Sequence, residues 1–294
     1  MVPFQYRTSI VRAAMIDLDL LVEFVRYYPA QPATGFWRAV EIGAVLRIGI
    51  PEGRGLDLGC GDGILTDVLL RRGGARTLVG VDIDPREGLI AERFPFYERV
   101  HICSSDAIPE PAGSFDFVLS NSVLEHIPEL DATIAEISRV LRPGGRFIFT
   151  VPGPAFHENL ASARGRADKR EAYLARIDRR LGHVHYLSCE SWAELCNRHQ
   201  LRVETCEDYL TPEETRRWER LSALTGGALY RLFGQKVPPI GIQRRMGLRQ
   251  LQHQWRMPGP LARLIGKAVA AHLHSGRALP SGSGSCLLIT GHRA

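Results

Sequence analysis

A glycine-rich turn between a predicted strand and a predicted helix is the feature that most constrains the fold of this 294-residue chain. The apolar segment 54–59 predicts a strand, and the residues from 63 to 72 predict a helix. Between them the chain reads Asp57-Leu-Gly-Cys-Gly-Asp-Gly63. Glycine allows a sharp turn and a close approach of backbone to ligand, and the start of a helix presents N–H groups at its positive end. This context is typical of nucleotide-binding α/β folds.

Short apolar segments alternate with segments of helical spacing along roughly the next 150 residues. The order predicts a parallel sheet with helices on both faces. Residues 142–145 (Arg-Pro-Gly-Gly) have the composition of a turn. Helices are expected at 130–141, 167–181 and 188–200, and further strands at 77–83, 100–105, 115–121, 146–152, 201–210 and 285–293.

The chain divides into three predicted parts. Residues 1–50, with helices expected at 8–28 and 36–48, form an N-terminal helical lid in which Phe4 and Tyr6 fold across the site. Residues 51–210 together with 281–294 form the ligand-binding α/β domain. Residues 211–280 form a basic, mostly helical insertion before the last strand, with an amphipathic helix expected at 260–274.

Charge is distributed unevenly between these parts. Residues 211–294 hold 13 basic and 3 acidic residues, and no carboxylate side chain follows Glu219. One interpretation is a basic face that is simply solvated. A stretch of this length without a carboxylate favours the alternative, a surface that binds a phospholipid headgroup, a pyrophosphate or a nucleic acid.

Composition excludes several other classes of protein. Apolar residues make up 45% of the chain and charged residues 23%, which is ordinary for a globular protein. No apolar run is long enough to span a bilayer, and the N-terminus lacks the order of a signal peptide. None of the six cysteines forms a Cys-x-x-Cys pair, so we expect reduced thiols, no metal site and a cytoplasmic location.

The acidic residue at the end of the second predicted strand adds to the ligand-binding pattern. Asp82 lies 19 positions after Gly63, where an acid accepts hydrogen bonds from ribose hydroxyls in nucleotide-binding folds; Asp84 is an alternative. Nicotinamide dehydrogenases share this much. Four further elements distinguish this chain from such dehydrogenases: Ser105-Asp106-Ala107, Gly113-Ser-Phe-Asp-Phe-Val118, Leu124-Glu125-His126-Ile127 and Leu141-Arg-Pro-Gly-Gly145.

With these elements in this order, the chain resembles the class I methyltransferases that use S-adenosylmethionine, closely over residues 36–152 and more loosely beyond. The resemblance implies an α/β, Rossmann-like, doubly wound sheet of seven strands in the order 3-2-1-4-5-7-6. The last strand is expected to be antiparallel, with the N-terminal helices and the helical insertion added to this core.

The resemblance also implies which residues contact the cofactor. The methionine part would lie on Asp57 and the loop of Gly59, Cys60, Gly61 and Gly63. Asp82, with Ile83 beside it, would bind the ribose, and Asp106 with Ala107 the adenine. Ser120 and Asn121, at the end of the fourth strand, would approach the sulfonium.

Methyl transfer is an in-line displacement, so alignment is the main task of the protein. A base is needed only for an acceptor such as a hydroxyl. We expect the segment His183-Val-His185-Tyr186 to face the acceptor, with His185 favoured as base and His126 and Tyr186 as further candidates; a surface loop is an equal alternative.

The function indicated is methylation, most simply O-methylation, of a small-molecule, glycan or lipid-linked acceptor. The basic region 220–280 would then contact an anionic membrane surface, which predicts a peripheral location at the inner face of the membrane. The alternatives are an RNA methyltransferase, disfavoured because no RNA-binding module is recognisable, and a non-catalytic binding protein that kept the fold.

Overall fold

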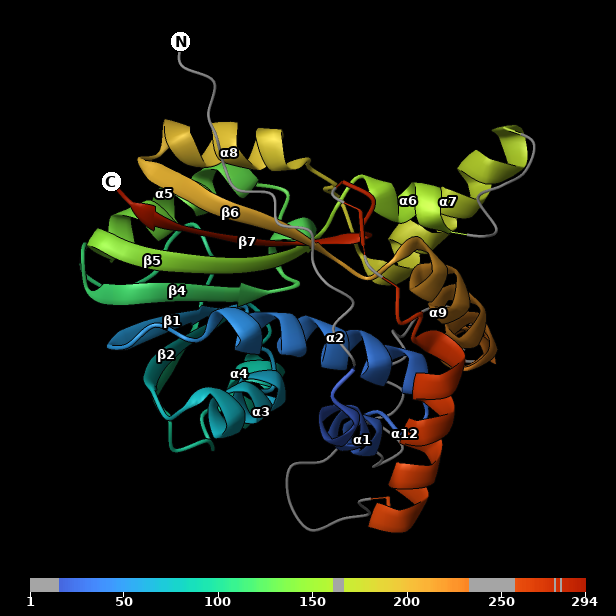
Figure 1. Cartoon of the computed structure of the whole chain (residues 1–294). Coiled ribbons are helices and arrows are strands. Elements are labelled where there is room, and N and C mark those ends of the chain that lie inside the picture. The colour runs from blue at the N-terminus through green and yellow to red at the C-terminus, as the bar shows by residue number, and fades with distance from the viewer. Residues whose placement is uncertain (1–15, 161–166, 233–256, 278, 281) are drawn as a thin grey trace.

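The computed structural model describes residues 16–160, 167–232, 257–277, 279–280 and 282–294. A seven-stranded sheet in the order β3-β2-β1-β4-β5-β7-β6 forms its centre (Figure 1). Strands β1 to β5 pair in parallel, and β7 runs antiparallel to both β5 and β6. The predicted strand order and the predicted antiparallel last strand are therefore confirmed. The strands are β1 (Arg54–Leu58), β2 (Thr77–Asp82), β3 (Tyr97–Ile102), β4 (Phe115–Asn121), β5 (Leu141–Pro152), β6 (Leu201–Tyr209) and β7 (Cys286–Arg293).

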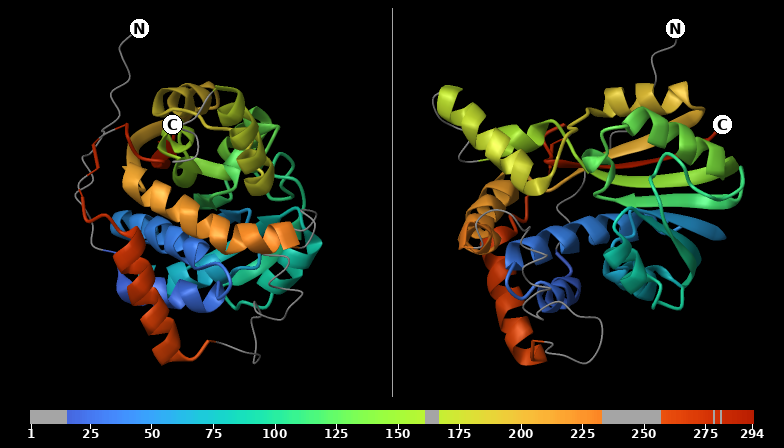
Figure 2. Two further views of the ribbon diagram at one scale, coloured as in Figure 1. Left: turned by 90° about the vertical axis from the view of Figure 1, so that its right-hand side faces the viewer. Right: turned by 180° about the vertical axis from the view of Figure 1, so that it is seen from behind.

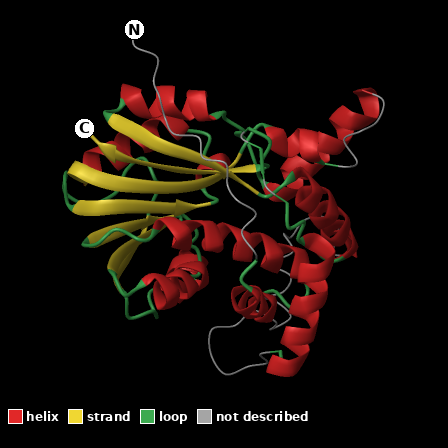
Figure 3. Cartoon of the chain, viewed as in Figure 1, coloured by secondary structure: helices red, strands yellow, loops and turns green. Residues whose placement is uncertain are grey.

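Helices cover both faces of this sheet (Figure 3). On one face, α2 (Pro32–Ile48), α3 (Ile64–Gly73) and α4 (Pro85–Ala91) pack against the sheet, with Phe36 and Ile42 fully buried. On the other, α5 (Leu130–Val140) and α8 (Cys189–Arg198) bury Ile134 and Trp192. Two apolar cores on opposite faces are the arrangement expected of a doubly wound sheet.

A further group of helices gathers beyond the carboxyl ends of the parallel strands (Figures 1 and 2). Helix α1 (Leu18–Tyr27) packs on α2 and α12 (Gly259–Leu273), and α9 (Pro212–Leu224) packs on α2 and α12. Helices α6 (Ala155–Asn159), α7 (Ala167–Leu181) and α10 (Gly226–Leu232) complete the group, together with the short 3-10 helix η1 (Leu124–His126) at the end of β4. The described helices of the N-terminal part and of the insertion, α1, α2, α9, α10 and α12, thus lie together at the edge where ligands bind in such sheets.

Several local predictions are wrong. The third strand spans 97–102 rather than 100–105, and the 142–145 turn is part of β5, where Gly144 takes a positive φ of 73° within the irregular start of the strand. Helices α4, α6, α9 and α10 were not predicted individually. Residues 8–15 of the first predicted helix, as well as Phe4 and Tyr6, lie outside the described residues. Among the helices that are described, none has the length and apolar character needed to cross a bilayer.

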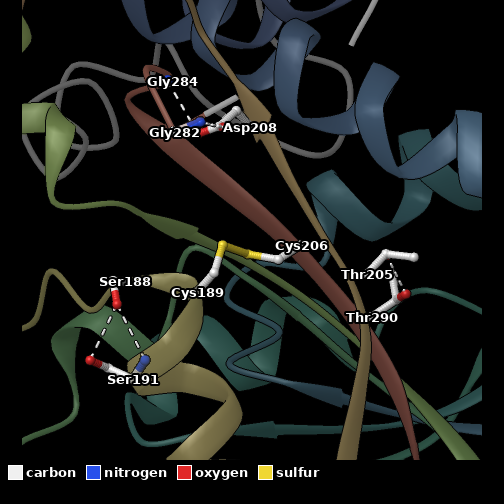
Figure 4. Close-up of a disulfide and its surroundings, with 9 residues drawn as sticks. All are labelled: Ser188, Cys189, Ser191, Thr205, Cys206, Asp208, Gly282, Gly284 and Thr290. Carbon is white, nitrogen blue, oxygen red and sulfur yellow. Dashed lines mark hydrogen bonds between the residues drawn. A yellow bond between two sulfur atoms is a disulfide. The ribbon is translucent and has the colours of Figure 1, made fainter. Parts of the chain in front are cut away.

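The expectation of six reduced thiols is wrong for one pair. Cys189, at the start of α8, and Cys206, on β6, form a disulfide with a Cα–Cα distance of 6.1 Å (Figure 4). The prediction failed because the two residues are 17 positions apart and meet only when α8 packs on β6. Cys60, Cys103, Cys196 and Cys286 are free. Ser188 caps α8, because its side chain accepts a hydrogen bond from the Ser191 N–H.

Candidate functional site

The glycine loop after β1 is tied to the end of β2. The N–H groups of Gly59 and Cys60 both donate to the Val81 carbonyl, at 2.8 and 3.0 Å. Gly59, Gly61 and Gly63 all have positive φ, a conformation that side chains rarely adopt. A Cβ atom on Gly59 would meet Val123, whereas one on Gly61 would meet no atom of the described residues within 4 Å. The loop is therefore held from behind and open at Gly61.

Asp57, a predicted cofactor residue, supports this loop from below. Asp57 is buried, and one of its oxygens accepts hydrogen bonds from the hydroxyls of Thr66, at 2.6 Å, and Tyr97. Burial raises the pKa of Asp57 to about 6, and it also raises the pKa of the Cys60 thiol. Asp57 thus joins β1, α3 and β3 beneath the loop.

Asp82 lies at the end of β2 and contacts the loop directly. One of its carboxylate oxygens accepts the Gly61 N–H at 2.8 Å, and the other accepts the Asp84 N–H at 2.9 Å. Ile83 beside it is 75% exposed, and Asp106 and Ala107 after β3 are exposed too. An exposed apolar side chain next to Asp82, together with the exposed Asp106 after the neighbouring strand, fits the ribose and adenine of a nucleoside, which need hydrogen-bond acceptors and an apolar face.

Unpartnered polar atoms lie at the end of β4. Ser120 and Asn121 are buried, and neither the Ser120 hydroxyl nor either polar atom of the Asn121 amide has a hydrogen-bond partner among the residues that the structure describes. Buried polar groups of this kind normally bind a ligand or water. They fit the polar methionine portion of the cofactor predicted to lie at this edge of the sheet.

A pocket of about 150 Å³ adjoins the same strand end. Its walls come from α2, from the segment that follows β4, from the end of α7 and from α9. Two of the lining residues, Trp37 and Trp218, pack against each other with their ring centroids 5.0 Å apart. Val123, which packs against Gly59, connects this segment to the glycine loop. The lining residues are Thr34, Trp37, Arg38, Ser122, Glu125, His126, Leu181, His183 and Trp218.

A family model described as a methyltransferase domain matches residues 36–205, which is more than half of the chain. The chain belongs to the class I methyltransferases. It is an enzyme that uses S-adenosylmethionine, and the predicted family is confirmed.

Individual relatives agree with this family. A ubiquinone biosynthesis O-methyltransferase of Xanthomonas oryzae pv. oryzae is 30% identical over 188 residues, which cover 61% of this chain and 74% of that enzyme. The enzyme of the same description from Aromatoleum aromaticum is 28% identical over 54% of this chain and 67% of its own length. A solved structure of a possible histamine N-methyltransferase from Thermotoga maritima superposes with a TM-score of 0.52, at 16% identity, over 95% of this chain and 98% of its own. That structural likeness concerns the fold.

In this methyltransferase, a buried carboxylate on α2 connects the N-terminal helices to the strand ends. Glu41 accepts hydrogen bonds from the hydroxyls of Ser122, at 2.7 Å, and Thr150, at 2.5 Å, and pairs with Arg38 at 2.5 Å. Burial would lower the pKa of Arg38, but the Glu41 carboxylate more than offsets this and raises it. Ser122 takes a positive φ of 52°. Glu41 therefore binds both Arg38, a cation that lines the pocket, and Ser122, whose backbone conformation is rare for residues other than glycine.

Three side chains of the methyltransferase meet at the polar end of the pocket. Glu125 is 2% exposed, and burial raises its pKa to about 8. Burial also lowers the pKa of His183 to about 3 and that of His126 below its usual value. Potential metal-ligand atoms of these three residues all lie within 4.8 Å of one another. The group can therefore handle a proton or hold a cation.

The favoured catalytic residue, His185, is not part of the pocket lining. Its Nε2 lies 2.9 Å from the Ile127 carbonyl oxygen. The Tyr186 hydroxyl also points elsewhere, because it donates to Asp178 at 2.6 Å. His126 and His183 do line the pocket. The geometry thus favours His183 over its neighbour two residues along the chain.

Glu41, Arg38 and Trp218 were not predicted as site residues. Glu41 and Arg38 had one signal in the sequence: they are two of the three charged residues in the mostly apolar helix predicted at 36–48. Trp218 had none, because α9 reaches the pocket only through its packing against α2.

Proposed function

We propose that the enzyme transfers the methyl group of S-adenosylmethionine to a hydroxyl of a small acceptor bound in the pocket between α2, α9 and the end of β4. One observation carries this proposal: the pocket ends in Glu125, His126 and His183, beside the strand end that holds Ser120 and Asn121. Polar groups are thereby available at the point where a hydroxyl would meet the cofactor.

The pocket suits a single planar ring. Its volume of about 150 Å³ is small, and the Trp37 and Trp218 rings offer apolar surfaces for stacking. Arg38 adds a positive charge that favours an electron-rich or anionic ring. The relatives named ubiquinone biosynthesis O-methyltransferases support O-methylation in particular.

The chemistry divides between cofactor and chain. S-adenosylmethionine supplies a methyl group already activated on a sulfonium. The chain aligns the acceptor oxygen with that methyl group and excludes water. Trp37 and Trp218 position the ring, and the polar end of the pocket faces the hydroxyl. The α1–α2 lid is part of this proposal, because Thr34, Trp37 and Arg38 on α2 close one side of the pocket.

Methyl transfer from tritiated S-adenosylmethionine to catechols and phenols tests this function, with arylamines and thiols of the same size for comparison. We expect transfer to the hydroxyl compounds. Trp218→Ala should raise KM at least about tenfold while cofactor binding is unchanged, since it removes one stacking surface; Trp218→Phe, which keeps a ring, serves as the matched control. Transfer to amines alone, or a Trp218→Ala variant with the wild-type KM, would contradict the proposal.

The outer face of α12 supports a membrane-bound supply of acceptor. The helix buries Ala262, Gly266 and Val269, while Leu264 is 66% and Leu261 is 44% exposed. Arg263 and Lys267 are exposed on the same helix. Exposed leucines beside basic residues are characteristic of helices that lie on anionic bilayers. In this proposal a lipid-linked acceptor reaches the enzyme at the inner face of the membrane.

Sedimentation with vesicles of phosphatidylcholine and phosphatidylglycerol tests the membrane surface. Wild type should bind, and added salt should weaken binding by screening. The double variant Leu261→Ser, Leu264→Ser should lose at least about tenfold in affinity, because each leucine contributes on the order of 1.5 kcal/mol or more when buried. Leu89→Ser on α4, where the side chain is 59% exposed, is the control. Equal binding by both variants and wild type would refute an α12 contact.

A further inference from the structure

Two segments of the chain far apart in sequence bring metal-ligand atoms together. Glu125 and His126 follow β4, and His183 follows α7. The Glu125 Oε1 atom lies 3.9 Å from His126 Nε2 and 4.0 Å from His183 Nε2. Bonds of about 2.1 Å at a tetrahedral angle place ligand atoms about 3.4 Å apart. The two Glu125 distances exceed this value by roughly half an ångström, and all three ligand atoms lie within 4.8 Å of one another, so side-chain shifts alone would bring them to the separations of a bound cation.

The hydrogen bonds of the two imidazoles show which ring nitrogen is free. His126 Nδ1 lies 2.8 Å from the Gly182 carbonyl oxygen. A carbonyl can only accept, so in the neutral ring this nitrogen carries the proton and Nε2 has the lone pair. His183 Nδ1 lies 3.1 Å from the Tyr186 hydroxyl, which gives its own proton to Asp178. His183 Nδ1 is therefore also the donor, and its Nε2 lone pair is free as well.

These contacts are the ones that usually support metal-binding histidines. Such a histidine donates its second N–H to a carbonyl or, directly or through another group, to a carboxylate, which fixes the ring and increases its basicity. Here one ring donates to the Gly182 carbonyl and the other to a Tyr186–Asp178 pair. Both rings are thereby oriented with Nε2 toward Glu125.

One of the two oxygens of the Glu125 carboxylate is unpartnered. Its Oε2 is buried and has no hydrogen-bond partner among the described residues. Its backbone carbonyl accepts the N–H groups of Val184, at 2.8 Å, and His185, at 3.3 Å, which ties together the two segments that carry the ligands. Arg38, the nearby cation, is bonded to Glu41. A buried carboxylate of this kind is costly unless it is paired or coordinates a metal.

We propose that Glu125, His126 and His183 bind a divalent transition-metal ion of the zinc or cobalt type. Two imidazoles and one carboxylate are a donor set that these ions favour over calcium or magnesium. Three protein ligands leave a coordination position open toward the pocket, as in catalytic sites. That an acceptor oxygen occupies the open position rests on the proposed function; binding of the ion does not.

Spectroscopy on the metal-free enzyme tests the site without any acceptor. After removal of metal with a chelator, Co²⁺ should give visible d–d absorption that saturates at one equivalent, and calorimetry with Zn²⁺ should show the same stoichiometry. Glu125→Gln and His183→Ala should each weaken binding at least about 100-fold, and Tyr186→Phe about tenfold through the ring it orients.

His185→Ala is the matched control, since this histidine lies two residues from a proposed ligand and its ring contacts the Ile127 carbonyl. It should bind Co²⁺ within about threefold of wild type, and circular dichroism together with S-adenosylmethionine binding shows that each variant is folded. No saturable binding by wild type, or unchanged affinity in folded Glu125→Gln and His183→Ala, would overturn the metal site. Failure of the acceptor assay alone would count against the proposed function and leave metal binding to this direct measurement.

Discussion

Replacement of Glu41 by Ala should lower the free energy of unfolding by about 3–5 kcal/mol, the usual cost of breaking a buried ion pair. The carboxylate is completely buried and accepts hydrogen bonds from Ser122, Thr150 and Arg38. Alanine leaves the Thr150 hydroxyl buried without this acceptor, and it leaves Arg38 without its carboxylate. Unfolding in urea, followed by circular dichroism, measures the loss.

Two further variants separate the contributions to this loss. Glu41→Gln keeps an oxygen for the two hydroxyls but removes the charge opposite Arg38, so its loss should be smaller, about 1–3 kcal/mol. Glu204→Ala removes a carboxylate that pairs with Arg146 on the exposed surface of the sheet and should cost less than about 1 kcal/mol. Equal losses at positions 41 and 204 would show that Glu41 is not a structural link between α2 and the strand ends.

The sheet could be predicted because its signals are local. Each strand is a short apolar segment bounded by turn residues, and the glycine loop, Asp82 and Asp106 occur at fixed points along that series. The resemblance to methyltransferases then supplied the strand order, which short-range patterns do not contain. Boundaries were less accurate: the Arg142–Gly145 turn is part of β5 because Leu141 already pairs with Phe115.

The pocket between α2, α9 and the end of β4 could be predicted only in part, because it depends on contacts between distant segments. The sequence indicated that residues 183–186 face the acceptor but favoured His185, whose ring contacts a carbonyl. His183, and not His185, lines the pocket. This arrangement depends on the hydrogen bonds that the Val184 and His185 N–H groups donate to the backbone carbonyl of Glu125. The Cys189–Cys206 disulfide and the contribution of Trp218 likewise depend on helix packing.

Replacement of Asp82 by Ala should weaken S-adenosylmethionine binding about 10- to 100-fold. Hydrogen bonds to a charged group contribute about 1.5–3 kcal/mol, and this carboxylate is expected to accept them from the ribose. It also accepts the Gly61 N–H, so its loss frees the part of the glycine loop that is open to a ligand. Calorimetry with S-adenosylmethionine and S-adenosylhomocysteine measures the change, with NAD as the ligand that should not bind.

Asp84 is the matched control because it is a second carboxylate only two residues away. Its side chain accepts the Arg86 N–H and caps α4, so Asp84→Ala should destabilise that helix end while cofactor affinity stays within about threefold. If Asp84→Ala abolished binding and Asp82→Ala did not, the ribose would be bound by the second carboxylate. Binding of NAD by wild type would mean that the loop and Asp82 serve a dinucleotide, since these two elements are common to both classes of enzyme. The paired variants therefore measure directly whether Asp82 is the carboxylate that binds the ribose, as the resemblance to methyltransferases implies.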